Sequence, residues 1–390
     1  MTIPDSVVKT LRGAIRPDRL LDTARGLVAV PSPTRSAGAV ADRLAEILTA
    51  DGFAVSRPPA GWPQAPAVVA RFATQKPGRT LQFDGHLDTV HLPFVPPRVA
   101  DGVLYGSGAA DMKGGIAAAC EAMRVLRETG VLQTGGVLLT AHDLHECPWG
   151  DGSQVDRLMD DGVVGDAVLL PEYLSDCLPV VGRGLAVIEA RVGRDGVPVH
   201  EVLGGIDQPN VIAAGAELVR RFAERDRELA RTIHPVAGRA SYFVGRVSAG
   251  EIYNQSPTEF QLAGTRRWLP GTSRVEVERE CFDMLARVAS QTGTRIEGVF
   301  TVARDAFQLD DRHAIVEAFH SGYEAVTGRR LPAGAKPFVD DGNSFASRGG
   351  LAAISHGPAA HGAHTLNESV AVDELTRVAL VYALTAVAFC

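Results

Sequence analysis

The stretch Leu81-Gln-Phe-Asp-Gly-His-Leu-Asp88 decides the fold class of this chain. Polar side chains directly follow its apolar segment, Leu81–Phe83. Two more apolar segments, Val137–Ala141 and Ala167–Leu170, are followed by polar side chains in the same way. Segments of this kind, with few polar residues, are typical of strands buried on both faces of a sheet. Helical spacing of apolar residues between the strands predicts an α/β domain with a mostly parallel sheet.

Carboxylate and imidazole groups follow each apolar segment. His86 and Asp88 follow the first, and Asp111 ends a glycine-rich stretch further along. Glu146 follows the second segment and Glu172 the third. Functional sites of open α/β sheets lie outside the carboxyl ends of the strands. Unpaired carboxylates gathered there would repel one another, and a bound cation removes that cost. A mixed set of His, Asp and Glu suits zinc or a similar divalent ion.

The pattern changes near Val181. From Ala186–Val192 to Arg295–Val302 the elements follow the order βαββαβ, which predicts a two-layer α/β sandwich. After it the first pattern resumes. We therefore expect one catalytic domain formed by residues 1–180 and 305–390, interrupted by a smaller domain at 181–304.

Composition excludes several classes of protein. The chain has 390 residues, 45% hydrophobic and 22% charged, which is ordinary for a globular protein of about two domains. Its net charge of −7 and scattered Arg argue against nucleic-acid binding. Its five cysteines form no CxxC pair, which argues against a disulfide framework or a thiolate zinc site. With no apolar run long enough for a membrane span and no signal-peptide core, we expect a soluble, cytoplasmic protein.

Common catalytic motifs are missing from the sequence. An HExxH zinc motif at His145-Glu146 fails because position 149 is Trp and Pro148 would disrupt the helix. We find no P-loop, no complete dinucleotide-binding fingerprint and no GxSxG elbow. Cys147 adjoins the polar cluster, and we expect a small buried thiol there rather than a nucleophile or ligand.

Taken together, three segments resemble the zinc-dependent amidohydrolase and metallopeptidase family of acetylornithine deacetylase, succinyl-diaminopimelate desuccinylase, aminoacylase and related carboxypeptidases. These segments are Phe83–Val90, Asp101–Gly115 and Ala363–Glu368. The resemblance covers nearly the whole chain. It implies that the inserted domain is a lid, and that the protein is a homodimer through that lid.

The resemblance also implies a site for two metal ions. His86, Asp111 and Glu172 match the ligands of one ion. Asp111, Glu146 and His364 match the ligands of the other, so that Asp111 bridges the pair. Zinc is the expected metal, with cobalt or manganese as alternatives.

Two further residues bear on this ligand set. Asp88 matches a carboxylate behind His86 that accepts the second N–H of the imidazole and so fixes its tautomer. His361 is an alternative to His364, although the sequence Ala-His-Thr-Leu-Asn-Glu around His364 favours the latter.

Three lid residues match positions that act on the substrate in relatives. His200 matches a histidine that reaches across the dimer to the tetrahedral oxyanion. Asn254 and Arg267 match substrate-binding positions, and an Arg fork suits a substrate carboxylate. Arg266 could exchange roles with Arg267, because neighbouring residues of a strand point to opposite faces.

One position departs from the family pattern. Relatives carry two consecutive glutamates, first the general base and then a ligand, where this chain has His145-Glu146. In one interpretation His145 is the base, because neighbouring cations keep an imidazole neutral. In a second, Asp143 takes over; in a third, the protein does not hydrolyse its ligand. Asp341 matches a recurring aspartate of unclear role and is not assigned to the site.

These observations lead to one function and two alternatives. We expect a di-metal hydrolase that cleaves the amide of a small N-acyl amino acid or dipeptide-like substrate carrying a carboxylate. A metal-bridged hydroxide would attack the amide, and His145 would take and return the proton. A carboxypeptidase or dipeptidase is an alternative within the class. A non-hydrolytic relative that forms an amide, transfers an acyl group, cyclises or only binds its ligand is the alternative outside it.

Overall fold

The computed structural model describes residues 3–390, which form two compact units. Unit 1 comprises the residues up to Val180, together with Leu309–Ala335 and Asp340–Cys390. Unit 2 comprises Val181–Gln308 and the short segment Lys336–Val339, which the sequence pattern had assigned to the returning catalytic segment. The chain therefore passes between the units four times rather than twice.

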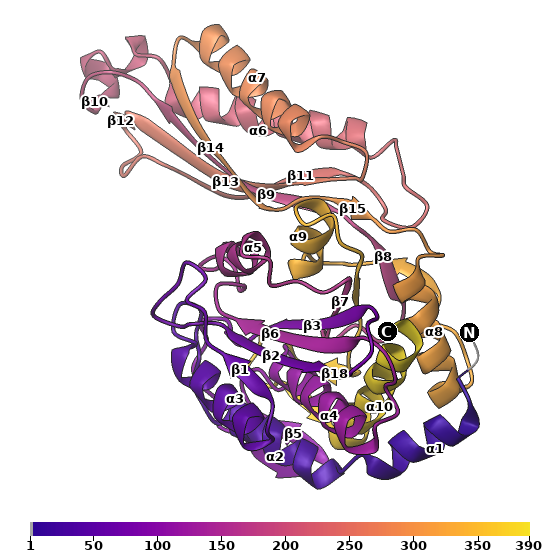
Figure 1. Cartoon of the computed structure of the whole chain (residues 1–390). Helices are drawn as coiled ribbons and strands as arrows, with labels where there is room; N and C mark the ends of the chain where they lie inside the picture. The colour runs from indigo at the N-terminus through magenta and orange to yellow at the C-terminus, as the bar shows by residue number, and fades with distance from the viewer. Residues whose placement is uncertain (1–2) are drawn as a thin grey trace. The chain divides into compact units, whose positions relative to one another are not determined.

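The sheet of unit 1 confirms the predicted mostly parallel α/β class. Four neighbouring strands run parallel, and two further strands extend the sheet antiparallel at one side (Figure 1). In spatial order the strands are β1 (Ala54–Ser56), β2 (Val68–Ala73), β6 (Gly136–His142), β3 (Thr80–His86), β7 (Ala167–Leu170) and β17 (Ala353–Ser355).

The helices of unit 1 supply much of its core. α4 (Lys113–Thr129) is buried along most of its length, because its Ala residues allow other elements to approach closely. α10 (Val372–Phe389) is also largely buried and packs on α4 and on α8 (Ala314–Thr327). The remaining helices are α1 (Asp5–Ala14), α2 (Pro17–Val28), α3 (Gly38–Ala50), α5 (Ser153–Asp160) and α9 (Asp341–Ser347).

Two features of unit 1 were not predicted from the sequence. The first is α9, which a capping box at Asp340 starts. The glycine-rich stretch also contributes to a small separate sheet. Its strands, in spatial order, are β18 (Ala360–His361), β19 (Ser369–Ala371), β5 (Val103–Tyr105) and β4 (Arg98–Ala100).

Unit 2 is an antiparallel sheet with helices α6 (Val211–Leu229) and α7 (Arg274–Thr292) packed against it. Side chains of Asn210 and Ser273 accept hydrogen bonds from the first turns of these helices, which fixes where each begins. The strands, in spatial order, are β11 (Ser241–Ala249), β13 (Glu259–Trp268), β9 (Gly184–Gly193) and β14 (Arg295–Arg304).

Several short strands pair outside the two main sheets. β10 (Val199–His200) pairs with β12 (Gln255–Ser256), and β8 (Leu178–Gly182) pairs with β15 (Phe307–Gln308). β16 (Ala333–Ala335) precedes the return of the chain to unit 2. Within residues 3–390, none of the helices has the length and hydropathy that a membrane span requires.

Candidate metal centre

The register between two parallel strands brings the first polar groups together. β3 pairs with β6 so that His86 lies beside His142 and Asp84 beside Thr140. The hydroxyl of Thr140 donates a 2.5 Å hydrogen bond to Asp84 Oδ1. Because both strands end at the same edge of the sheet, their last residues and the loops that follow form the candidate site.

The Asp111 carboxylate lies between two histidines. His86 Nε2 is 3.1 Å from Asp111 Oδ1, and His364 Nε2 is 3.2 Å from Asp111 Oδ2. His364 Nε2 is also 3.2 Å from Glu146 Oε1. Burial alone would raise the pKa of Asp111, but the hydrogen bonds from His364 and His86 hold it below the usual range. A buried, ionised carboxylate with a histidine at each oxygen is arranged to bridge two cations.

Glu172 completes this set from the end of β7. It is buried, and the pKa of its carboxyl is raised well above the usual range by burial and by the nearby charge of Asp111. A bound cation would remove that penalty and favour the ionised form. The backbone at Glu172 packs closely against the backbone at Gly357. A Cβ atom at position 357 would lie 2.1 Å from the Glu172 carbonyl oxygen. Glycine at position 357 therefore lets this loop carry Glu172 into the site.

The donor atoms are close enough together to hold ions. Ligand atoms of His86, Asp111 and Glu146 lie within 4.8 Å of one another, and so do those of His86, His145 and Glu172. A buried set of imidazoles and carboxylates is the donor chemistry that zinc and similar divalent ions prefer. The residues present therefore offer the donor types that the expected ions need, and neither of the two triads is one of the two expected ligand sets.

The position of Asp88 differs in detail from the expectation. The ring nitrogen Nδ1 of His86 is 2.9 Å from the Asp88 backbone oxygen but 3.6 Å from its carboxylate. The carboxylate instead accepts hydrogen bonds from the backbone N–H groups of His145, at 3.2 Å, and Glu146, at 2.9 Å. Asp88 thus orients the imidazole with its main chain and fixes the His145-Glu146 backbone with its side chain.

Glu368 is a site residue whose role was not predicted from the sequence. Its Oε2 accepts hydrogen bonds from the backbone N–H groups of Ala110, at 3.2 Å, and Asp111, at 3.3 Å. Burial raises the pKa of Glu368 to about 7. The residue is part of the Ala363–Glu368 motif, and its carboxylate holds the loop that carries Asp111.

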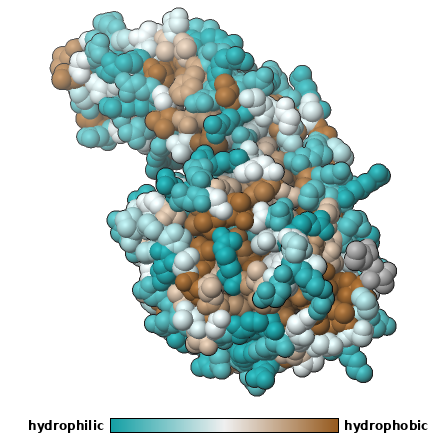
Figure 2. Space-filling model, viewed as in Figure 1, coloured by the Kyte–Doolittle hydropathy of each residue, from teal (hydrophilic) through white to brown (hydrophobic). Residues whose placement is uncertain are grey.

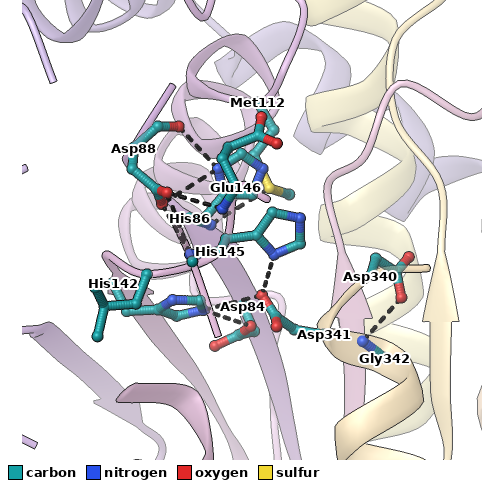
Figure 3. A network of polar contacts seen from close by, with 12 residues as sticks. Asp84, His86, Asp88, Met112, His142, His145, Glu146, Asp340, Asp341 and Gly342 are labelled. Carbon is teal, nitrogen blue, oxygen red and sulfur yellow. Dashed lines mark hydrogen bonds and ion pairs between the residues drawn. The ribbon is translucent and has the colours of Figure 1, made fainter. Parts of the chain in front are cut away.

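His145 points into a network behind the candidate ligands (Figure 3). Its ring lies parallel to that of His86, with the centroids 4.0 Å apart and 4° between the planes. Its Nδ1 lies 2.6 Å from Asp341 Oδ2. The lone pair of a histidine nitrogen lies in the plane of its ring, so a bound ion lies close to that plane. Because the two rings are stacked in separate parallel planes, one ion cannot lie in the planes of both. In this orientation His145 is a neighbour of the ion that His86 would bind rather than a second ligand of that ion.

Behind His145 lies a fully buried trio, Asp84, His142 and Asp341, whose ligand-type atoms lie within 4.8 Å of one another. His142 Nε2 is 3.3 Å from Asp84 Oδ2 and 3.4 Å from Asp341 Oδ2. Burial alone would lower the pKa of His142, but the charge of Asp84 and then of Asp341 raises it to about 9. Asp341 was not assigned to the site from the sequence, where its match to a recurring aspartate was the only signal for it.

The structure also places the alternative residues. The Asp143 carboxylate accepts backbone hydrogen bonds from Arg35, at 2.9 Å, and Ala37, at 3.0 Å, so it holds a loop together. His361 lies exposed in β18, whereas His364 contacts two candidate ligands. Cys147 is exposed, so the expectation of a buried thiol was wrong. It lies in a surface turn, which single-residue burial preferences do not predict.

The lid residues all lie in unit 2. The side-chain amide of Asn254 is 3.0 Å from Nε2 of the exposed His200. Arg266 is buried, and its guanidinium lies 4.7 Å from the centre of the Tyr242 ring and 3.4 Å from Glu280 of α7. Arg267 is half-buried on the opposite side of β13, and within residues 3–390 its guanidinium has no hydrogen-bond acceptor.

Comparisons with known proteins agree with this description. The model of peptidase family M20/M25/M40 matches residues 83–388. The succinyl-diaminopimelate desuccinylase of Methylorubrum extorquens is 26% identical over 393 residues, which cover 93% of this chain and 96% of that protein.

Solved structures agree as well. Aminopeptidase PepT from Bacillus cereus superposes with a TM-score of 0.80 at 21% identity, covering 96% of this chain and 100% of that one. A dinuclear metal binding peptidase from Bacillus subtilis superposes with a TM-score of 0.70 at 16% identity, covering 95% and 97%.

The fold and the donor set define a metal-dependent amidohydrolase. The chain belongs to peptidase family M20/M25/M40, whose matched region covers most of its length.

Proposed function

We propose that this protein is a di-metal hydrolase that cleaves the amide bond of a small N-acyl amino acid or dipeptide-like substrate. The observation that carries the proposal is the buried Asp111 carboxylate, whose two oxygens face His86 and His364 at 3.1 and 3.2 Å. His86, Asp111 and Glu172 would hold one ion, and Asp111, Glu146 and His364 the other. The donor chemistry favours zinc.

Two ions held in this way supply an activated water and polarise the scissile carbonyl. The chain itself must then accept and return a proton. His145 is the candidate for this role, because a ring nitrogen of His145 lies within 4.8 Å of ligand atoms of His86 and Glu172, and its Nδ1 lies 2.6 Å from Asp341 Oδ2. Asp88 supports the step by fixing the backbone of His145 and Glu146.

The lid would hold the substrate. The half-buried guanidinium of Arg267 is suited to a substrate carboxylate, and its planar fork can bind both oxygens. We expect Asn254 to bind the same end of the substrate. The Methylorubrum relative is named for the removal of a succinyl group, so N-succinyl and N-acetyl amino acids are the first substrates to test.

A homodimer through unit 2 is part of this proposal. Apolar side chains are exposed at the tip of unit 2 that carries β10 and β12, where Figure 2 shows apolar surface. Val202, Leu203 and Ile206 are 75%, 76% and 86% exposed. Clustered exposure of this kind marks a contact surface. In such a dimer, we expect His200 of the partner subunit to support the oxyanion.

Two alternatives remain. A carboxypeptidase or dipeptidase is the alternative within the class, and the solved relatives that are named peptidases support it at the level of peptide hydrolysis. The alternative outside the class is a non-hydrolytic protein that forms an amide, transfers an acyl group, cyclises or only binds its ligand. The histidine at position 145 is the observation that supports it.

One experiment separates these possibilities. The zinc- or cobalt-loaded wild type and the His145→Glu variant are assayed on N-acetyl amino acids, N-succinyl amino acids and dipeptides. Turnover by the wild type on one class supports hydrolysis and identifies the substrate. No turnover by the wild type, with activity gained in His145→Glu, would exclude hydrolysis as the native reaction.

A further inference from the structure

Asp341 makes the shortest polar contact of His145. Asp341 Oδ2 lies 2.6 Å from Nδ1 of the imidazole, and the two side chains are only 1% and 12% exposed. A carboxylate this close accepts the hydrogen carried by Nδ1. In a neutral imidazole only one nitrogen carries a hydrogen, so Nε2 is then the acceptor nitrogen.

The position of Asp341 is itself fixed from two sides. It is the first residue of α9, and the preceding Asp340 caps that helix by accepting a 2.9 Å hydrogen bond from Gly342 N–H. On the other side, Nε2 of His142 faces both carboxylates, at 3.4 Å from Asp341 Oδ2 and 3.3 Å from Asp84 Oδ2 (Figure 3). A protonated His142 offsets one of the two carboxylate charges that it faces.

The ring of His145 is likewise held by two contacts. Its flat face lies on His86, and its edge is bound by Asp341. These contacts fix the plane of the ring and its rotation within that plane. The backbone N–H of His145 is bound to Asp88, which fixes the main chain.

We propose that Asp341 is the positioning residue of His145: it accepts the Nδ1 hydrogen, sets the tautomer of the neutral ring and directs Nε2 toward the metal centre. This inference rests on the proposed function, in which His145 exchanges a proton with the reacting groups. It also explains how a histidine can replace the glutamate of relatives. An imidazole has two nitrogens, and a second group must decide which of them faces the substrate.

A third metal site at Asp84, His142 and Asp341 is the competing explanation of the same atoms. Within the trio, Nε2 of His142 already lies within ion-pair distance of both carboxylates, and a protonated His142 offsets one of their two charges. Thr140 binds Asp84 from the far side. The contacts within the trio favour the positioning role.

The wild-type tautomer is the first test. Nitrogen NMR of zinc-loaded protein labelled at histidine, with the His145 signals assigned by their loss in His145→Gln, reports which ring nitrogen carries the hydrogen. Hydrogen on Nδ1 is the expected result. Hydrogen on Nε2 would overturn the proposal, whether or not the protein hydrolyses any substrate, so this measurement is independent of the proposed function.

The second test uses Asp341→Asn, which keeps the shape of the side chain and removes its charge. The amide can turn its NH2 group to His145 and favour the wrong tautomer. We expect kcat to fall about 10- to 100-fold, with KM and bound zinc within about twofold of wild type. An unchanged kcat and an unchanged His145 tautomer in this variant would overturn the proposal.

Asp340→Asn is the matched control, because Asp340 is equally buried and its carboxylate instead caps α9 and accepts a hydrogen bond from the Ser355 hydroxyl. It should lower stability and leave the His145 tautomer as in the wild type. If Asp340→Asn changes the tautomer as much as Asp341→Asn does, a general loosening of α9 explains both, and the proposal fails.

Discussion

Gly115 lies directly against the carbonyl group of Pro171. A Cβ atom built on Gly115 would stand 2.0 Å from the Pro171 oxygen. Gly115 belongs to the first turn of α4, only four residues after Asp111, and Pro171 immediately precedes Glu172. One backbone contact therefore sets the spacing between the segments that carry two candidate ligands.

Gly115→Ala should consequently disturb the metal centre. Backbone must move to admit the methyl group, and overpacking of this kind costs about 1–3 kcal/mol. We expect lower stability in chemical denaturation and weaker zinc binding in calorimetry. Gly13→Ala is the control, because Gly13 lies in α1 with nothing within 4 Å of the added atom. It should be neutral or stabilising by up to about 1 kcal/mol. Equal effects of both substitutions would contradict this explanation.

Metal removal should lower stability. Without ions, Glu172 is buried near the charge of Asp111 at an energetic cost. Zinc binding to the native state should raise the free energy of unfolding, by about 2.7 kcal/mol at a free concentration of about 100 times Kd. Glu172→Gln removes one ligand and one charge together. We expect it to be no less stable than the wild type without metal, and to gain less stability when zinc is added.

His145→Ala should separate chemistry from metal binding. Loss of a general acid–base group lowers kcat by about 10²- to 10⁴-fold. Zinc content should stay at the wild-type value, because the ring plane of His145 is parallel to that of His86 and not directed at the same ion. Metal analysis of the purified variant alongside steady-state kinetics tests this. Loss of one zinc per chain would show that His145 is a ligand instead.

Stability should depend on pH through His142. In the metal-free folded protein its pKa is raised to about 9, whereas an unfolded histidine has a pKa of about 6.5. The native state holds the extra proton, so this stabilisation is fully present below pH about 6.5 and is lost as pH rises through about 9. The His142→Gln variant should be less stable than the wild type at pH 6. The difference between their free energies of unfolding should be smaller at pH 9.5. A difference in free energy of unfolding that is the same at both pH values would show that the charge of His142 does not stabilise the fold.

Arg267→Ala should weaken substrate binding. The guanidinium lies half-buried on the face of β13 opposite Arg266. Loss of a charge-assisted hydrogen bond of about 1.5–3 kcal/mol would raise KM by roughly 10- to 100-fold. Arg266→Ala is the control, since that side chain contacts Tyr242 and Glu280 inside unit 2. Arg266→Ala should reduce stability with little change in KM. If Arg266→Ala raises KM and Arg267→Ala does not, Arg266 is the residue that binds the substrate.

Much of the fold could be predicted from local patterns. Leu81–Phe83 and Val137–Ala141 are apolar runs bounded by polar groups, and both are strands of the central sheet. Asp111 and His364 lie in motifs with strong resemblance to a family, and they meet as expected. α9 could not be predicted in the same way, because it is a short helix started by side-chain capping at Asp340 rather than by apolar periodicity.

The network behind His145 could not be predicted at all. Thr140 and Asp84 are 56 residues apart in sequence, and only the register of β3 against β6 brings them together. The 2.6 Å contact between His145 and Asp341 joins residues 196 apart. The spacing of residues in the sequence carries no information about contacts between residues so far apart. The histidine at position 145, by contrast, could be seen in the sequence to replace the glutamate of relatives.

The central claim is a two-metal centre bridged by Asp111, with His145 beside the ions and not bound to them. Anomalous diffraction at the zinc edge from crystals of zinc-loaded protein tests it most directly. We predict two peaks about 3.5–4 Å apart on either side of the Asp111 carboxylate, with no His145 nitrogen at bonding distance, about 2.0–2.1 Å, from either. A single peak at saturating zinc, or a bond from His145 to an ion, would contradict the account.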